Sequence, residues 1–176
     1  MPIATRAFAA TAADQPLSPY SFDRRDPGPD DVAIEIKYCG VCHSDLHVVH
    51  NDLGGTRYPI VPGHEIAGIV TAVGANVTRF KEGDRVGVGC MVDSCRTCSS
   101  CQAGEEQYCD NGMTGTYNSF ERGTNIPTYG GYSNNIVVDE KYTLKISDKL
   151  HKIIIPGSHR YDDNIPIVTK AILKGL

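Results

Sequence analysis

The sequence lacks any long apolar run and any basic tract. No stretch of its 176 residues approaches the roughly 20 apolar residues that a membrane helix needs. The formal net charge is -4, and no cluster of lysine and arginine resembles a nucleic-acid footprint. The first 13 residues hold one basic residue, Arg6, and no apolar run long enough for a signal peptide. We therefore expect a cytoplasmic protein with no membrane partner and no nucleic-acid partner.

The sequence also lacks internal repeats, low-complexity segments and any G-x-G-x-x-G motif. Without that motif, no phosphate-cradling turn of a dinucleotide-binding fold can be assigned. Hydrophobic residues make up 40% and charged residues 22%, as in ordinary globular proteins. A chain of this length suits one domain, or one domain with a short appendage.

The apolar runs are short and are separated by 18 glycines and 10 prolines, which favours strands over helices. Period-two alternation and short apolar runs predict strands at residues 32–37, 66–73, 85–88, 136–138 and 142–146. A short helix is predicted at 44–51, and residues 91–131 read as loop-rich. The pattern predicts a mainly β, barrel-like body that carries a metal-braced lobe.

The end of the chain has a different pattern. Residues 153–155 are three isoleucines and predict a buried strand. Asp163 or Asn164 could cap a following helix, and Gly175 suits its end. One strand and one helix are too little for a second domain. We therefore expect a main domain at 1–150 and a strand-helix remnant at 151–176.

Four of the seven cysteines lie within fifteen residues, in the pattern Cys95-x2-Cys98-x2-Cys101-x7-Cys109. In a reducing compartment such thiols are metal ligands more often than disulfides. Four closely spaced thiolates can wrap one zinc ion in a closed tetrahedron, which leaves no position for chemistry. An iron–sulfur cluster and a set of free or oxidising thiols are the alternatives. Cys90 lies outside the pattern, and we expect it to be a packed thiol.

A second set of metal-capable groups comes from two other segments. Cys42, His64 and Glu65 offer sulfur, nitrogen and oxygen, a mixture typical of catalytic zinc. The alternative for His64 and Glu65 is a polar pair after a Pro-Gly turn. The run from Cys39 to His43 also matches CxxCH, the attachment signature of c-type haem, which is an alternative from another functional class.

Six longer motifs resemble one protein family. They are YCGVCHSDLH at 38–47, YPIVPGHE at 58–65, GDRVGVGC at 83–90, DSC at 93–95 with the cysteine run, GMTGTYN at 112–118 and GGYSNNIVV at 130–138. The chain resembles zinc-dependent medium-chain alcohol dehydrogenases. It is most similar to their cinnamyl alcohol dehydrogenase-like branch and the bacterial NADP-dependent aldehyde reductases. The resemblance covers roughly the first 148 residues.

The resemblance implies a GroES-like, partly open β-barrel with a zinc-braced lobe. In that family the Cys95 cluster holds the structural zinc. Cys42 and His64 match catalytic zinc ligands, and Glu65 matches an adjacent acidic ligand. The implied reaction moves hydride between NADP(H) and a small alcohol or aldehyde.

The resemblance also implies roles for four residues of the segment 43–47. Ser44 matches the hydroxyl that takes the alcohol proton, and His47 matches the histidine that relays it through the coenzyme ribose. Asp45 matches a carboxylate that orients the ligand histidine, as metal-bound imidazoles usually require. His43 matches a position near the coenzyme phosphates. The alternatives are a helix cap for Ser44, a first-turn charge for Asp45 and surface positions for the two histidines.

The chain departs from the family pattern in two respects. Family members continue into a Rossmann domain, and before it they place a further catalytic-zinc cysteine, whereas no cysteine follows Cys109 here. Residues 152–163 and 171–176 resemble the end of that Rossmann domain. We therefore expect an internally deleted dehydrogenase joined near Leu150 and His151, with impaired turnover. The alternative is a non-catalytic zinc-binding GroES-like module, whose uncovered face would favour association, including self-association.

Overall fold

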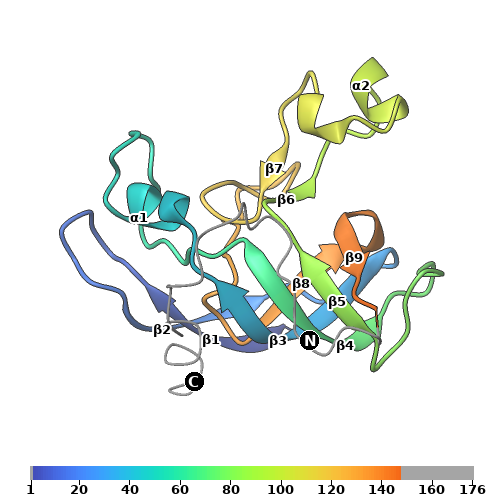
Figure 1. Cartoon of the computed structure of the whole chain (residues 1–176), viewed down its shortest axis with the longest axis horizontal. Helices are drawn as coiled ribbons and strands as arrows, with labels where there is room; N and C mark the ends of the chain where they lie inside the picture. The colour runs from blue at the N-terminus through green and yellow to red at the C-terminus, as the bar shows by residue number, and fades with distance from the viewer. Residues whose placement is uncertain (1, 148–176) are drawn as a thin grey trace.

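A computed structural model describes residues 2–147 of the chain. The main sheet has five antiparallel strands in the order β8-β3-β4-β5-β9. It curls around a core, as Figure 1 shows. Its strands are β3 (Asp31–Gly40), β4 (Glu65–Val73), β5 (Arg85–Val88), β8 (Asn135–Asp139) and β9 (Thr143–Lys145).

A two-stranded antiparallel ribbon of β1 (Ile3–Ala9) and β2 (Ser18–Arg24) extends the curled sheet. The Phe8 N–H donates to the carbonyl oxygen of Tyr132 at 2.8 Å and joins β1 to the segment before β8. From β2, the half-buried Arg24 donates from Nε to the Asn135 carbonyl oxygen at 2.7 Å. Burial, the largest effect on it, lowers the pKa of Arg24 to about 9. The ribbon and the sheet together form a partly open β-barrel.

The core lies inside the curl of these strands. Fully buried valine and isoleucine side chains of β3, β4, β5 and β8 fill it, and aromatic residues close its ends. Branched side chains suit strands that are packed on one face, because they lose little rotamer freedom there. Val32, Ile34, Val86, Val88 and Val138 are each no more than 1% exposed.

Two features stand away from the barrel and carry the candidate sites (Figure 1). Helix α1 (His43–Val49) follows β3 directly. A separate lobe contains short elements: β6 (Met91–Asp93), α2 (Ser99–Gln102), the 3-10 helix η1 (Glu106–Tyr108) and β7 (Thr114–Gly115). A second 3-10 helix, η2 (Glu140–Tyr142), joins β8 to β9. Within residues 94–113 the buried hydrophobic side chains are those of Cys101 and Cys109, so metal bound by the cysteines is the natural brace of the lobe.

The mainly β fold, the five predicted strands and the short helix are confirmed. The sequence reading missed β1 and β2. In β1 the side chains that face inward include Thr5 and Ala7, which are small or polar and give no apolar signal. The predicted domain boundary at 150 and the remnant at 151–176 lie outside the described residues. Within residues 2–147, no helix has the length and apolar character to cross a bilayer.

Candidate metal centres

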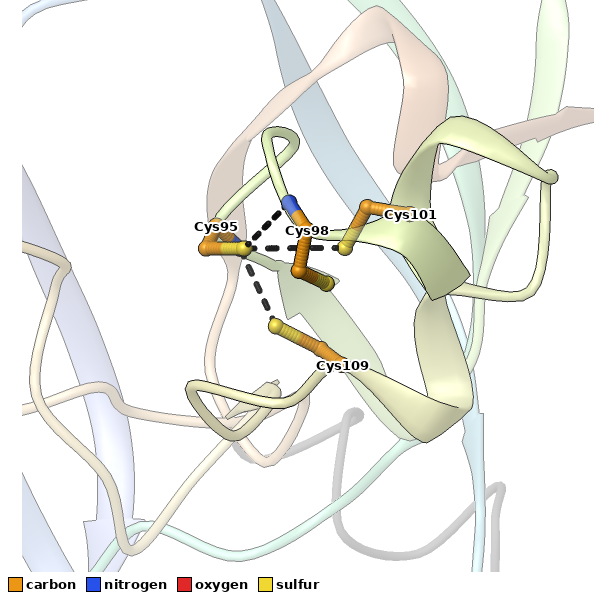
Figure 2. Close-up of side chains that lie close together, drawn as sticks. All are labelled: Cys95, Cys98, Cys101 and Cys109. Atoms are coloured by element: carbon orange, nitrogen blue, oxygen red, sulfur yellow. Dashed lines mark hydrogen bonds between the residues drawn. The ribbon is translucent and has the colours of Figure 1, made fainter.

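The four lobe cysteines converge on one point. Their sulfur atoms all lie within 4.8 Å of one another, and Figure 2 shows them turned toward a common centre. The Sγ atoms of Cys95 and Cys101 are 3.9 Å apart. Zinc–sulfur bonds of about 2.3 Å place the sulfurs of a tetrahedron about 3.8 Å apart. The spacing therefore fits one four-coordinate ion.

Hydrogen bonds favour the thiolate form of Cys95. Hydrogen bonds from the side chain of Asn111 and from the backbone N–H groups of Thr97 and Cys98 lower the pKa of Cys95 to about 5. The Cys98 N–H donates to Cys95 Sγ at 3.3 Å. The Cys95 N–H in turn donates to Cys109 Sγ at 3.4 Å. Such donors favour the thiolate, which is the form that binds metal.

Side chains also tie the cysteine lobe to the barrel. The Tyr142 hydroxyl donates to Ser94 Oγ at 2.7 Å, and Ser94 Oγ lies 3.2 Å from Cys101 Sγ. The Arg96 guanidinium bridges Asp93 of the lobe and Asp139 of β8, at 2.8 Å to each. A metal held by the cysteines is thus linked mechanically to the barrel.

The second candidate centre lies where β3 gives way to helix α1. Cys42 is the residue directly before α1, whereas His64 follows the Pro62-Gly63 turn and Glu65 begins β4. Their ligand atoms lie within 4.8 Å of one another. The sheet brings them together because Gly40, near the end of β3, pairs with Glu65 across the ladder. The mixed set of sulfur, nitrogen and oxygen suits a zinc ion that keeps an open position.

The carboxylate of Glu65 lies directly over Gly40. A Cβ atom on Gly40 would meet Glu65 Oε2 at 2.1 Å, so any other residue there would displace the Glu65 carboxylate. Glu65 itself is 7% exposed. Burial raises the pKa of Glu65; the nearby His64 opposes this effect and the Asp45 carboxylate adds to it.

Asp45 lies behind this centre and is 1% exposed. Its Oδ1 is 3.7 Å from His64 Nδ1 and accepts the Gly63 N–H at 3.1 Å. Its Oδ2 accepts the Cys42 N–H at 2.9 Å and the Tyr132 hydroxyl at 3.2 Å. One buried carboxylate therefore holds the backbone beside both candidate ligands, Cys42 and His64.

The other residues named from the sequence line the same helix. The Ser44 hydroxyl donates to Cys42 Sγ at 3.1 Å, and because α1 begins at His43, Ser44 is inside the helix and not its cap. The rings of His43 and His47 stack with centroids 4.7 Å apart. His47 Nδ1 lies 2.8 Å from Asp52 Oδ2. A spacing of three places Ser44 and His47 on one side of the helix.

Cys39 and Cys90 lie outside both candidate sets of metal ligands. Cys90 is exposed, so its prediction as a packed thiol is wrong. It follows β5 in the chain, and it lines the same cleft as Ser44 and His64. Cys39 is buried in β3 and Cys42 is half-buried, an arrangement that does not present two accessible thiols to a haem.

The sequence reading missed two tyrosines of the centre. The Tyr117 ring stacks on the His64 imidazole with centroids 5.7 Å apart and an interplanar angle of 10°. Tyr132 is buried and bonds to Asp45 from the other side. Both lie in family-like motifs, GMTGTYN and GGYSNNIVV, but nothing in their spacing marks them as neighbours of a metal ligand.

Comparisons with known proteins identify relatives of this chain and the family to which it belongs. The chain is 59% identical over 144 residues to NADP-dependent alcohol dehydrogenase C of Mycobacterium tuberculosis (strain CDC 1551 / Oshkosh), a match that covers 82% of this chain and 41% of that protein. It is 57% identical over 141 residues to aldehyde reductase YahK of Escherichia coli (strain K12), covering 80% and 40%. The chain therefore spans about two-fifths of the length of these curated relatives.

Two solved structures are also similar to this chain. The structure of CAD from Helicobacter pylori complexed with NADP(H) superposes with a TM-score of 0.80 at 45% identity, covering 83% of this chain and 42% of that one. A cinnamyl alcohol dehydrogenase from Sorghum bicolor has the same TM-score at 46% identity, covering 83% and 41%. The family model that matches is the alcohol dehydrogenase GroES-like domain, over residues 28–148. The chain thus belongs to the alcohol dehydrogenase GroES-like domain family, as its motifs predicted.

Proposed function

We propose that this chain supplies the metal-binding and proton-transfer side of a zinc-dependent alcohol dehydrogenase that works as an NADP-linked aldehyde reductase. The observation that carries this proposal is the convergence of Cys42, His64 and Glu65, whose ligand atoms lie within 4.8 Å of one another, with Asp45 behind His64. The relatives named as NADP-dependent alcohol dehydrogenase and aldehyde reductase support the same reaction. The substrate class is a small alcohol or aldehyde.

The residues present fit a zinc ion at each centre. Cys95, Cys98, Cys101 and Cys109 would hold a structural zinc, because four thiolates close its coordination shell. At the second centre, Cys42, His64 and Glu65 offer three protein ligands of mixed type. A fourth coordination position would stay open for water or substrate. When bound, zinc supplies a Lewis acid and NADP(H) supplies or accepts the hydride.

The residues of helix α1 would move the proton. In alcohol oxidation, Ser44 would accept the proton of the alcohol and pass one toward His47 on the same side of the helix. In aldehyde reduction, Ser44 would donate a proton to the aldehyde oxygen and regain one from His47. Asp52 would hold His47 through Nδ1, which leaves Nε2 free to exchange the proton. His43, stacked on His47, would border the coenzyme phosphates. Asp45 would orient His64 and keep its imidazole in one plane.

A second function is favoured by one sequence observation. No G-x-G-x-x-G occurs among the 176 residues, so these residues contain no recognisable turn for the coenzyme pyrophosphate. A non-catalytic zinc-binding GroES-like module is therefore the alternative. Such a module could associate with a partner, or with a second copy, through the face that carries α1. A cytoplasmic setting suits either function, since it keeps the cysteine ligands reduced.

Zinc analysis combined with a coenzyme titration separates the two functions. Two zinc ions per chain and measurable NADPH binding support the dehydrogenase. One zinc ion without NADPH binding supports the module. We expect the 176-residue chain alone to show little NADPH-dependent reduction of an aldehyde such as cinnamaldehyde. Turnover comparable to that of a full-length relative would contradict this expectation.

A further inference from the structure

Tyr117 lies beside the cleft centre in a loop that is fixed on both sides. The preceding residue, Thr116, donates from its N–H to the Cys90 carbonyl oxygen at 3.1 Å and from Oγ1 to the Gly89 carbonyl oxygen at 2.6 Å. The following residue, Asn118, accepts the Arg57 N–H at 2.9 Å. The loop therefore presents the Tyr117 side chain in one place.

The Tyr117 ring covers one face of His64. The two rings are parallel within 10°, and their centroids are 5.7 Å apart. On the edge of the His64 ring, Nδ1 lies 3.7 Å from Oδ1 of the Asp45 carboxylate. A contact on the edge alone limits the ring less than contacts on the edge and one face. The Tyr117 ring thus restricts rotation of the imidazole and fixes the direction of its metal-facing nitrogen.

Tyr117 lines the cleft together with Ser44 and His64. The hydrogen bonds to the Asp45 carboxylate come from the Cys42 N–H, the Gly63 N–H and the Tyr132 hydroxyl. The contact of Tyr117 with the centre is therefore the stack of its ring on His64.

We infer that Tyr117 is a positioning residue of the cleft metal centre, because its ring fixes the plane of His64. The inference rests on the proposed metal site at Cys42, His64 and Glu65. Outer partners of metal ligands commonly change metal affinity by about 10- to 100-fold when they are removed. Tyr117 acts through His64 and is not itself placed among the ligands.

Cobalt substitution tests the inference on the whole 176-residue chain. Cleft affinity is measured by chelator competition on chains whose cysteine lobe is already loaded, and the visible Co²⁺ spectrum is recorded at saturation. Tyr117→Phe keeps the ring and removes the hydroxyl, whereas Tyr117→Leu removes both. Tyr129→Phe is the matched control, because Tyr129 packs on Phe22 with centroids 4.6 Å apart and does not line the cleft.

We expect Tyr117→Phe, which keeps the ring, to bind Co²⁺ at the cleft with wild-type affinity, and Tyr117→Leu to bind it about 10- to 100-fold more weakly with a shifted spectrum. The lobe should bind metal unchanged in all variants, which also reports that they fold. If Tyr117→Leu does not fold, Tyr117→Met, which also lacks the ring, decides. Unchanged affinity and spectrum in the variant without the ring, with a lowered unfolding midpoint only, would show a structural role and overturn the inference, as would equal weakening in Tyr117→Phe. Failure of the wild-type cleft to bind Co²⁺ would overturn the metal site and this inference together.

Discussion

Asp45 Oδ1 lies 3.7 Å from His64 Nδ1 and at the same time accepts the Gly63 N–H at 3.1 Å. The carboxylate therefore fixes both the imidazole and the backbone that carries it. Because Asp45 is 1% exposed, water cannot replace any hydrogen bond that it loses. Stability and metal affinity should depend on this one side chain together.

Replacing Asp45 by asparagine should affect both properties. In Asp45→Asn, an amide NH₂ group faces at least one buried N–H donor, at a cost of about 1–3 kcal/mol in the free energy of unfolding. Metal affinity at the cleft should fall about 10- to 100-fold. Urea denaturation and chelator competition measure the two effects. The exposed Asp14→Asn is the control, and equal behaviour of the two variants would contradict the role given to Asp45.

Gly40 should be sensitive to substitution because the Glu65 side chain occupies the space beside it. In Gly40→Ala the new methyl group would meet Glu65 Oε2 at 2.1 Å, so the carboxylate must shift from its place near Cys42 and His64. Overpacking of this kind costs about 1–3 kcal/mol. Gly89→Ala is the matched control, since a Cβ there meets nothing within 4 Å. Zinc titration and thermal unfolding should separate the two; similar results for both would show that Glu65 does not depend on Gly40.

The lobe should depend on its cysteines and not on Cys90. Cys109→Ser should remove one tightly bound zinc ion, whereas Cys90→Ser, at an exposed position, should retain it. Zinc binding to structural sites in peptides is worth roughly 10–16 kcal/mol. If about a third of this binding free energy stabilises the fold, the unfolding midpoint of Cys109→Ser should fall by about 10 °C in a chain of this size. Zinc loss from Cys90→Ser would instead place Cys90 among the ligands.

Asp31 should make the fold sensitive to acid. Burial opposes its ionisation, but the hydrogen bond and charge of Arg25 and the Gly28 N–H, at 2.6 Å, keep the pKa of Asp31 below its usual value. A lowered folded pKa stabilises the fold above the unfolded value of about 3.9, and this contribution is lost as the pH falls through the folded pKa.

The corresponding variant is Asp31→Asn. It should lose about 1–3 kcal/mol of unfolding free energy at pH 7 and should show a shallower loss of stability below about pH 4. Urea denaturation at pH 7, 4 and 3 measures this slope. The exposed Asp23→Asn serves as control, and metal loss in acid is common to both variants. A slope equal to that of the wild type would exclude Asp31 as the acid-sensitive group.

The sequence predicted those features whose signal is local. The CxxC spacing of the lobe identifies four ligands because one loop can wrap one ion. The valine-rich runs of β3, β5 and β8 identify core strands. By contrast, β1 is held by long-range hydrogen bonds, such as that from Phe8 to Tyr132, and its small buried residues give no apolar period.

The parts that sequence could not give depend on three-dimensional proximity. Cys90 follows a buried strand and reads as a core thiol, but the chain turns there toward the cleft. Tyr117 lies 53 positions from His64 along the chain, and only the fold stacks the two rings. The motifs could suggest that Cys42, His64 and Glu65 meet, but the closing of β3 on β4 is what brings their ligand atoms within 4.8 Å of one another.

The number of zinc ions per chain tests the central claim most directly. Wild-type protein equilibrated with zinc should hold two ions, measured by native mass spectrometry. Cys42→Ser and His64→Ala should each hold one ion, in the lobe, and Cys109→Ser should lose the lobe ion. A wild-type chain that holds one zinc ion, or a Cys42→Ser variant that still holds two, would contradict a metal centre at Cys42, His64 and Glu65.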